Sequence, residues 1–361
     1  MKNQEKIFVI GHKNPDTDSI CSAIAYCDIK NRTTQESRYI PKRAGQINEE
    51  TEYVLNRFGV QPPGYLSNIG TQVKDMDIRL SPEANKSISL KNAWDLMQEN
   101  SIVSLPIREK DGTLEGLITI GDIAKTYMDT TDSYLLSRAR TQYQRIAETI
   151  GGKVIEGNAH GYFIQGKIMV ATANPDKMKE YVEENDMVIM GNREEDHLQA
   201  IEQNVSCIIV GMGIEVTEKV LKLAHEKEII IISSPYDTFT ISRLINQSIP
   251  VKYIMKTDNL VTFNTEDFTD DIQEVMIKHR HRAFPVINKK GKCIGTISRR
   301  NFLDMHRKKV VLVDHNEKDQ AVDNIDKADI MEIIDHHKLG TLQTMQPISF
   351  RNQPVGCTGT I

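Results

Sequence analysis

Histidine and aspartate gather in short segments whose residue types and spacing suit metal chemistry. In Gly11-His-Lys-Asn-Pro-Asp-Thr-Asp-Ser19, the side chains of His12, Asp16 and Asp18 lie within one short polar stretch. A turn can direct three such side chains into one cavity, where imidazole and carboxylate groups suit manganese or a similar divalent ion. Helix capping is the plainer interpretation, in which Asp16, Asp18 or Ser19 accepts the first N–H groups of a helix. This segment alone does not separate the two interpretations.

Two later segments favour the metal interpretation. Leu312-Val-Asp-His-Asn-Glu317 and Ile334-Asp-His-His-Lys338 each place an acid and a histidine at the end of an apolar strand. Ligands of open parallel sheets bind at the carboxyl ends of strands, so three such clusters predict one binuclear centre. A binuclear centre suits phosphoryl transfer, because it can activate water at neutral pH and hold both the attacking and the leaving oxygens.

The elements that carry these clusters have α/β order. Strands are expected at residues 6–10, 38–41, 310–313 and 330–334, and helices at 19–26 and 49–58. Alternating strands and helices predict a parallel sheet with helices packed against it. Since both ends of the chain have this pattern, residues 1–65 and 309–361 are expected to form one domain, with the rest of the chain inserted.

An internal repeat occupies part of the insertion. Three residue pairs recur at one constant spacing: Met97 with Met276, Pro106 with Pro285, and Gly116 with Gly295. Each copy has the pattern helix, strand, polar turn, strand, helix. A constant register over this length predicts two copies of one supersecondary unit, at residues 66–129 and 251–308.

A third kind of segment, residues 130–250, separates the two copies. It is expected to begin with a polar helix at 134–150. Apolar strands are expected at 187–190, 207–210 and 229–232, with an amphipathic helix at 216–227. This alternation predicts a small parallel α/β domain.

Composition excludes several classes of protein. The 361 residues carry a formal net charge of −5, which disfavours a nucleic-acid-coating role. No apolar run approaches the about 20 residues that span a bilayer, so no membrane partner is expected. The five cysteines have no CxxC spacing and are expected to be reduced thiols of a cytoplasmic protein.

The three metal-type segments resemble those of the DHH phosphoesterases. Gly11–Tyr26, Ala44-Gly-Gln46 and Pro354-Val-Gly-Cys-Thr358 are similar to family II inorganic pyrophosphatases in particular. The repeat resembles the CBS domain, which works in pairs, and residues 130–250 resemble the DRTGG domain. The resemblance implies an α/β fold in which a parallel-sheet DHH domain is interrupted by a CBS pair, itself split by a DRTGG-like domain. The expected division is 1–65, 66–129, 130–250, 251–308 and 309–361.

The resemblance also implies a metal role for five residues. His12 and Asp16 would bind one divalent ion, and Asp18 and His336 would bind the other. Asp314 would bridge the two ions and take part in catalysis. Manganese is the expected metal, with cobalt and magnesium as alternatives.

The implied substrate is pyrophosphate. His337 would be catalytic by contacting the substrate phosphate. Asp335 would orient its neighbouring site residues without contacting metal or substrate itself. Family members have a further metal-binding aspartate and a cationic second lobe beyond the position of Ile361. Because phosphoryl transfer depends on charge stabilisation, this polypeptide is expected to be a nearly inert fragment of an active hydrolase.

Four residues of the repeat lie at the positions of the nucleotide motif of CBS domains. Thr119 and Asp122 match it fully, and their hydroxyl and carboxylate would contact phosphate and ribose. The second copy offers Ser298 but has Asn301 where aspartate is usual, which puts its ribose contact in doubt. The resemblance thus implies regulation by adenine nucleotides, namely AMP, ADP, ATP or diadenosine polyphosphates.

The basic run Lys278-His-Arg-His-Arg282 precedes the first strand of the second copy. Arg280 and Arg282 could hold the phosphates of a nucleotide. The alternative is a solvated helix end favoured by the helix dipole. CBS pairs commonly associate with a second pair, so a homodimer is expected.

Two other functions stay open from the residues. One is an adenine-nucleotide-binding regulatory protein with a vestigial catalytic domain. The other is a DHH exonuclease or exopolyphosphatase, against which the acidic net charge and the Pro-Val-Gly-Cys-Thr box stand. Turnover of pyrophosphate compared with that of a short oligonucleotide would separate the hydrolases.

Overall fold

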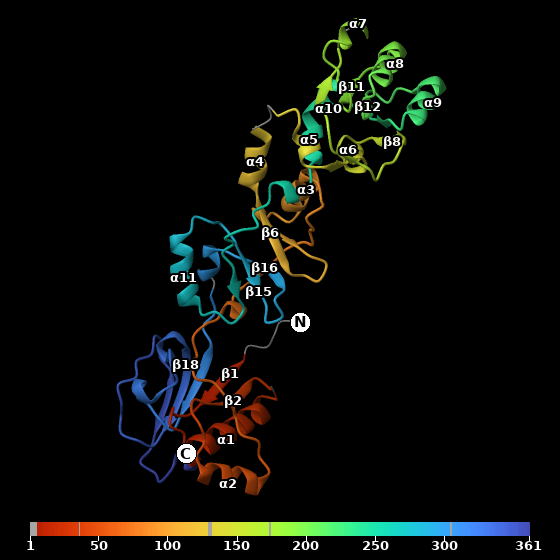
Figure 1. Ribbon diagram of the computed structural model, residues 1–361. Helices are drawn as coiled ribbons and strands as arrows, with labels where there is room; N and C mark the ends of the chain where they lie inside the picture. Colours follow the sequence, from red (N-terminus) through yellow and green to blue (C-terminus); the bar gives the residue numbers. More distant parts are fainter. Residues whose placement is uncertain (1–5, 36, 129–131, 173–174, 304) are drawn as a thin grey trace. The chain divides into compact units, whose positions relative to one another are not determined.

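The computed structural model of this chain describes residues 6–35, 37–128, 132–172, 175–303 and 305–361. They form two compact units (Figure 1). The terminal unit comprises Met1–Ile78, Phe263–His281 and Ser298–Ile361, and the central unit comprises Arg79–Thr262 and Arg282–Ile297. The boundary expected between residues 129 and 130 lies outside the described residues, and the five-segment division stays a prediction.

A six-stranded parallel sheet forms the centre of the terminal unit. Its strands are β1 (Ile7–Ile10), β2 (Tyr39–Arg43), β3 (Gly64–Tyr65), β17 (Lys309–Val313), β18 (Asp329–Asp335) and β19 (Ser349–Asn352), in the order β19-β18-β17-β1-β2-β3. β1 pairs with β17, with Ile7 beside Lys309 and Ile10 beside Leu312. Strands from both ends of the chain therefore lie next to each other, red beside blue in Figure 1.

The central strands of this sheet are apolar because both of their faces are covered. Val311 and Val313 of β17 pack in a cluster with Ala23 of the helix that follows β1. Val310 and Leu312 point the other way, into a second buried cluster. Alternate residues of one strand thus fill two cores, as the period of a strand requires. The prediction of an α/β fold with a parallel sheet is confirmed.

The terminal unit also contains three α-helices and several short elements. They are α1 (Thr17–Thr34), α2 (Glu49–Phe58), α11 (Thr269–Lys278), the 3₁₀ helices η1 (Val73–Asp75), η4 (Arg299–Phe302), η5 (Lys318–Gln320), η6 (Ile325–Lys327) and η7 (Thr358–Thr360), and strand β14 (Phe263–Asn264). α2 has the predicted bounds. α1 runs beyond residue 26 and ends at Gln35, where the backbone enters the left-handed region with φ of +54°.

The two repeat copies share one strand register. The first contains α3 (Leu90–Glu99), β5 (Ser104–Arg108), β6 (Leu114–Thr119) and α4 (Ile120–Met128), and the second contains α11, β15 (Phe284–Ile287), β16 (Cys293–Ile297) and η4. Ile107 pairs with Gly116 in the first hairpin, and Val286 pairs with Gly295 in the second. Both hairpins shift register directly after this pair. The predicted repeat is therefore present in the backbone as well as in the residues.

The prediction that the second copy ends in an α-helix is wrong for the described residues. Between β16 and β17 they form only the short 3₁₀ helix η4. The guanidinium of Arg299 donates to the carbonyls of Met276 and His279, and Asn301 donates to the carbonyl of Asp77 at 2.6 Å. These hydrogen bonds connect η4 to α11 and to the segment around Asp77, all within the terminal unit.

The central unit contains a second, five-stranded sheet in the order β10-β11-β12-β13-β8. Its strands are β8 (Lys153–Glu156), β10 (Ile168–Val170), β11 (Met187–Met190), β12 (Cys207–Val210) and β13 (Ile230–Ser233). This unit also contains α7 (Pro175–Met178), α8 (Glu194–Glu202), α9 (Glu218–Glu226), α10 (Thr238–Leu244), η2 (Ile245–Ser248), η3 (Val251–Tyr253) and strand β4 (Arg79–Leu80). Four strands are parallel, whereas β8 is antiparallel to β13, so the predicted purely parallel sheet is corrected to a mixed one.

The single helix predicted at 134–150 is also wrong. This segment forms α5 (Leu135–Arg138), β7 (Thr141–Gln142) and α6 (Tyr143–Thr149). Arg140 has a φ of +51°, which breaks the helix, and β7 pairs with β9 (Tyr162–Phe163). A tertiary strand pairing therefore overrides the local helical pattern.

No helix among the described residues is long and apolar enough to cross a membrane. The cysteines form no disulfide, and Cys27, Cys207 and Cys293 are buried.

Candidate metal centre

The turn after β1 carries the first predicted residues. A side-chain carbon at Gly11 would lie 1.8 Å from Oγ of Ser19, so glycine allows the turn to pack closely on α1. Beyond it, Nε2 of His12 lies 3.8 Å from Oδ2 of Asp16. An imidazole and a carboxylate thus meet at the carboxyl end of β1.

The two carboxylate oxygens of Asp16 make different contacts in this turn. Its Oδ1 accepts a 2.9 Å hydrogen bond from the backbone N–H of Ser19 and caps α1. Its Oδ2 is the atom nearest to His12. The capping and metal-ligand interpretations are therefore compatible, because they use different oxygens.

Asp314 follows β17 directly and lies between two imidazoles. Its Oδ2 is 3.3 Å from Nε2 of His12, and its Oδ1 is 3.3 Å from Nε2 of His336. The side chain is 1% exposed, and the residue has a φ of +64°. A left-handed backbone is uncommon outside glycine and clusters at functional sites.

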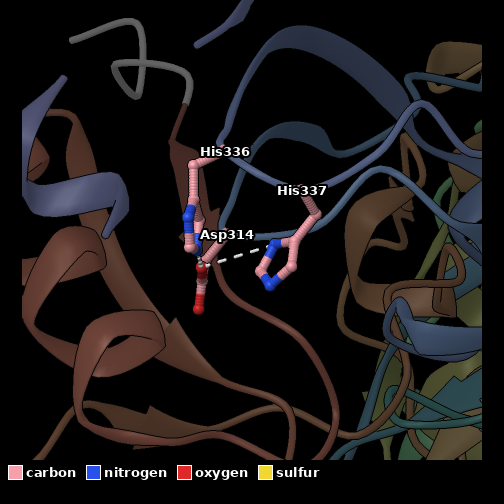
Figure 2. A group of neighbouring side chains, drawn as sticks. All are labelled: Asp314, His336 and His337. Carbon is pink, nitrogen blue, oxygen red and sulfur yellow. Dashed lines mark ion pairs between the residues drawn. The ribbon is translucent and has the colours of Figure 1, made fainter. Parts of the chain in front are cut away.

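His336 and His337 face the same carboxylate from the end of β18 (Figure 2). Nδ1 of His336 donates a 2.9 Å hydrogen bond to the carbonyl of Val355, which directs Nε2 toward Asp314. Nδ1 of His337 is 3.8 Å from Oδ1 of Asp314 but only 2.8 Å from Oδ1 of Asp335. His336 is therefore arranged as a ligand, whereas Asp335 already engages Nδ1 of His337.

Asp18 reaches the same place from the first turn of α1. Its Oδ2 lies 3.7 Å from Nε2 of His336. The backbone N–H groups of Thr358 and Gly359 donate to its carboxylate at 2.6 and 3.1 Å, and the Ser22 hydroxyl donates at 2.8 Å. Burial acts to raise the pKa of Asp18, but these hydrogen bonds outweigh it and hold the pKa below its ordinary value.

The environment of Asp314 fits a divalent cation. Burial raises the pKa of this carboxyl, and its contact with His12 raises the pKa of that imidazole. Oδ2 is buried and accepts no hydrogen bond of good geometry from the described residues. Two sets of donor atoms within 4.8 Å of one another meet at Asp314: His12 with Asp16, and His336 with His337. Imidazole nitrogens and carboxylate oxygens are suitable donors for manganese or cobalt, and a cation would satisfy the orphan oxygen.

The structure thus brings all seven residues predicted for metal and substrate to one edge of the sheet. Two further residues at this edge were missed. The hydroxyl of Thr358 donates to Oδ1 of Asp314 at 3.0 Å, and Nδ2 of Asn316 donates to Oδ2 of Asp335. Asn316 lies in the segment Leu312–Glu317 and Thr358 in the segment Pro354–Thr358, both of which the sequence singled out. An asparagine or a threonine in a loop does not by itself show which residue it hydrogen-bonds.

His315 lies beside Asp314 without joining the group of candidate ligands. Its Nδ1 donates to the carbonyl of Val313 at 3.0 Å, and the ring is almost fully buried. Burial lowers the pKa of His315 to about 4, so the imidazole is neutral at pH 7.

The predicted nucleotide residues form two hydrogen-bonded rings with the same pattern, each closed between a hydroxyl residue and the side chain three positions later. In the central unit, Oγ1 of Thr119 donates to Oδ2 of Asp122 at 2.6 Å. In the terminal unit, Oγ of Ser298 donates to Oδ1 of Asn301 at 2.8 Å. In each ring the backbone N–H of the hydroxyl residue donates to the same oxygen. Asn301 therefore reproduces the shape of the aspartate ring without its charge.

The exposed arginines of the basic run lie at the end of α11. Arg280 and Arg282 are both exposed to solvent, and the rings of His279 and His281 stack at 5.8 Å between centroids. A role in phosphate binding stays a prediction for both arginines.

Comparison with known proteins adds family information to this geometry. A DRTGG domain profile matches residues 145–248, and a CBS domain profile matches residues 80–129 and 251–308. The cobalt-dependent inorganic pyrophosphatase of Clostridium perfringens is 39% identical over 359 residues, which cover 99% of this chain and 65% of that protein. The chain is therefore similar over nearly its whole length to an inorganic pyrophosphatase, and it contains a CBS pair and a DRTGG domain.

A second relative has the same extent. A probable manganese-dependent inorganic pyrophosphatase of Thermotoga maritima is 33% identical over 361 residues, covering 100% of this chain and 66% of that protein. The chain therefore spans about two thirds of the length of these pyrophosphatases. Both relatives carry names that state dependence on a divalent metal.

A solved structure matches the inserted domains. The CBS and DRTGG domains of the regulatory region of Clostridium perfringens pyrophosphatase, in complex with the activator diadenosine tetraphosphate, align with a TM-score of 0.60 and 34% identity. The match covers 63% of this chain and 100% of the solved one. The CBS pair and the DRTGG domain are thus present here in fold as well as in sequence.

Proposed function

We propose that this protein is a metal-dependent inorganic pyrophosphatase of the DHH type that adenine nucleotides regulate through its CBS pair. One observation carries the proposal: the two oxygens of Asp314 each lie 3.3 Å from a different imidazole, those of His12 and His336. A carboxylate in this position can bridge two cations, with Asp16 beside His12 on one side and Asp18 3.7 Å from Nε2 of His336 on the other.

Two divalent ions would have separate ligands around this bridge. His12 and Asp16 would hold one ion, and Asp18 and His336 would hold the other. Manganese is proposed first, with cobalt or magnesium as alternatives, because the donors are imidazole nitrogens and carboxylate oxygens. When bound, such a pair supplies a nucleophile from water at neutral pH and neutralises charge on the phosphate oxygens.

His337 and Asp335 would act on the substrate side. Asp335 is fully buried and accepts a hydrogen bond from Nδ1 of His337, which leaves Nε2 of that ring for a phosphate oxygen. The His337 side chain is 52% exposed, so a substrate can reach it. The Asp335 carboxylate would hold the imidazole in one orientation.

Nucleotide regulation would use the two rings described above. Thr119 and Asp122 would contact the phosphate and ribose of one nucleotide, and Ser298 and Asn301 those of another, with Arg280 and Arg282 near the phosphates. AMP, ADP, ATP and diadenosine polyphosphates are the proposed effectors. The activator bound to the matching Clostridium region supports this class of ligand. A homodimer is proposed because CBS pairs commonly associate with a second pair.

The proposal is tested by phosphate release from diphosphate in the presence of manganese. Asp314→Asn should lower turnover by more than about 100-fold, because it removes the charge of the bridge while preserving shape. Asp326→Asn is the matched control, since Asp326 is an exposed carboxylate of the same unit that pairs only loosely with Lys318 at 3.6 Å. Full turnover in Asp314→Asn would refute the proposal.

The low turnover expected of these 361 residues stays a prediction. Calorimetry with manganese measures the metal centre without requiring activity. Tight binding of about two ions that is lost in Asp314→Asn supports the centre even if turnover is low. Absence of binding would count against it.

A nucleotide-binding regulatory protein with a vestigial catalytic centre is the second candidate. The observation in its favour is that the solved regulatory region is matched over 100% of its length. Diadenosine tetraphosphate binding together with no manganese uptake would favour this candidate over the enzyme.

A further inference from the structure

The loop after His337 passes very close to Asn316. A side-chain carbon at Gly340 would lie 2.6 Å from Oδ1 of Asn316 and 2.3 Å from Cγ of Glu317. These distances are far below ordinary contact, so residue 340 must be glycine for the loop to take this path. Glycine at this position therefore allows the loop backbone to contact Asn316.

Asn316 holds this loop through both ends of its amide. Oδ1 accepts a hydrogen bond from the backbone N–H of Gly340, and Nδ2 donates to the carbonyl of Lys338 at 2.9 Å. The backbone carbonyl of Asn316 also accepts from the N–H of Leu342 at 3.3 Å. Three positions of the loop are thus fixed to one buried residue.

The second hydrogen of the same amide goes to the carboxylate behind His337. Nδ2 of Asn316 donates to Oδ2 of Asp335, a residue with no solvent exposure. Oδ1 of Asp335 accepts from Nδ1 of His337 at 2.8 Å and from the backbone N–H groups of His336 and His337 at 2.8 and 3.2 Å. A carboxylate can only accept here, so the orientation of the Asn316 amide is determined.

We propose that Asn316 is a positioning residue for His337. It fixes the Asp335 carboxylate and the loop 338–340, and so keeps the Nδ1–H of His337 on Asp335. Nε2 then faces the substrate, where it donates to a phosphate oxygen when the ring carries both protons. The link to a phosphate oxygen rests on the proposed function, whereas the link between Asn316 and the ring of His337 does not. A bound substrate needs this ring held within a fraction of an ångström, because small misplacements lower turnover strongly.

Two variants of Asn316 separate the hydrogen bonds from the bulk of the side chain. Asn316→Leu keeps the branched shape but removes every hydrogen bond of the side chain, and Asn316→Ser supplies one hydroxyl that can still donate. Asn31→Ala is the matched control, because Asn31 also makes two hydrogen bonds of 2.9 Å with one partner, Tyr39, between α1 and β2. The thermal midpoint of each variant verifies that it is folded, and Asn316→Ser serves if Asn316→Leu is not.

The first measurement is the ring tautomer of His337 by ¹H–¹⁵N correlation, in the protein with diamagnetic magnesium at a pH where the ring is neutral. We expect the Nδ1-protonated form in the unsubstituted protein and in Asn31→Ala. In Asn316→Leu we expect a mixture with the Nε2-protonated form, and in Asn316→Ser an intermediate result. A folded Asn316→Leu that keeps the Nδ1-protonated form would overturn the proposal.

The second measurement is the kinetics of diphosphate hydrolysis with manganese. We expect kcat to fall about 10–100-fold in Asn316→Leu, with the manganese dissociation constant changed less than about threefold, because Asn316 contacts no proposed ligand side chain. Unchanged kcat, or a loss of activity that excess manganese restores, would overturn the role in catalysis. If the unsubstituted protein does not hydrolyse diphosphate, the proposed function fails while the tautomer measurement still decides the positioning role.

Discussion

The backbone N–H of Thr358 donates a 2.6 Å hydrogen bond to Oδ2 of Asp18, a residue 340 positions earlier in the chain. The hydroxyl of the same threonine donates to Oδ1 of Asp314 at 3.0 Å. One residue therefore orients two of the proposed metal ligands, one from the first turn of α1 and one from the end of β17. Its two hydrogen bonds can be tested separately, because one uses the backbone and the other the side chain.

Thr358→Val should weaken manganese binding by about tenfold or more, since hydrogen bonds behind metal ligands commonly contribute that much. The substitution keeps the side-chain shape and the N–H donor to Asp18 but removes the donor to Asp314. Calorimetry measures the affinity. Thr358→Ser keeps the hydroxyl and should bind as the unsubstituted protein does. Equal affinities for all three proteins would show that the hydroxyl has no such role.

Gly11→Ala should destabilise the terminal unit by about 1–3 kcal/mol, the usual cost of overpacking. The added carbon would lie 1.8 Å from Oγ of Ser19, so the turn and the start of α1 must move apart. Manganese affinity should fall as well, because His12 and Asp16 lie on this turn. Gly191→Ala is the control, as its added carbon meets nothing within 4 Å. Denaturant unfolding and calorimetry measure the two effects, and an unchanged midpoint for Gly11→Ala would contradict this account.

Asp122→Asn should weaken diadenosine tetraphosphate binding by about 10–100-fold, the effect of a lost hydrogen bond to a charged group. Asn301→Asp should leave binding unchanged or strengthen it, because Asn301 already occupies the same ring geometry without charge. Fluorescence titration or calorimetry gives both constants. Asp28→Asn, at an exposed ion pair with Arg32, is the control. If Asp122→Asn binds normally, the carboxylate does not contact the nucleotide.

The pKa of His225 should lie above 6.5, because its Nδ1 is 3.0 Å from Oε1 of Glu156 and the hydrogen bond favours the charged imidazole. For a raised pKa, the stabilising pair is fully formed below pH 6.5 and is lost as pH rises through the folded pKa. NMR titration of the imidazole tests the direction. Glu156→Gln should return the pKa toward 6.5, and a pKa already at or below that value in the unsubstituted protein would contradict the pairing.

The candidate ligands could be predicted because each follows an apolar strand. Asp314 ends the run of β17, and His336 and His337 follow β18. Parallel strands in one sheet present their carboxyl ends at the same edge, so the convergence of these residues needs only that the strands share a sheet. The pairing of β1 with β17 supplies this condition.

Other features had no comparable signal in the sequence. Arg140 breaks the segment expected to be one helix, yet arginine is a good helix former. The break depends on the pairing of β7 with β9, which lies some twenty positions later and outside any local pattern. Likewise, the short element after β16 depends on contacts of Arg299 and Asn301 with distant backbone carbonyls.

Residue types and their order alone determined the α/β alternation, the internal repeat and the chemistry available at the strand ends. These features are local or periodic, and burial of apolar residues imposes them on any compact form of the chain. Tertiary structure decided which oxygen of Asp314 faces which imidazole, and that Asn316 hydrogen-bonds to Asp335 and Thr358 to Asp314. Hydrogen-bond partners over such separations depend on backbone paths through loops, and no periodic pattern of residues encodes those paths.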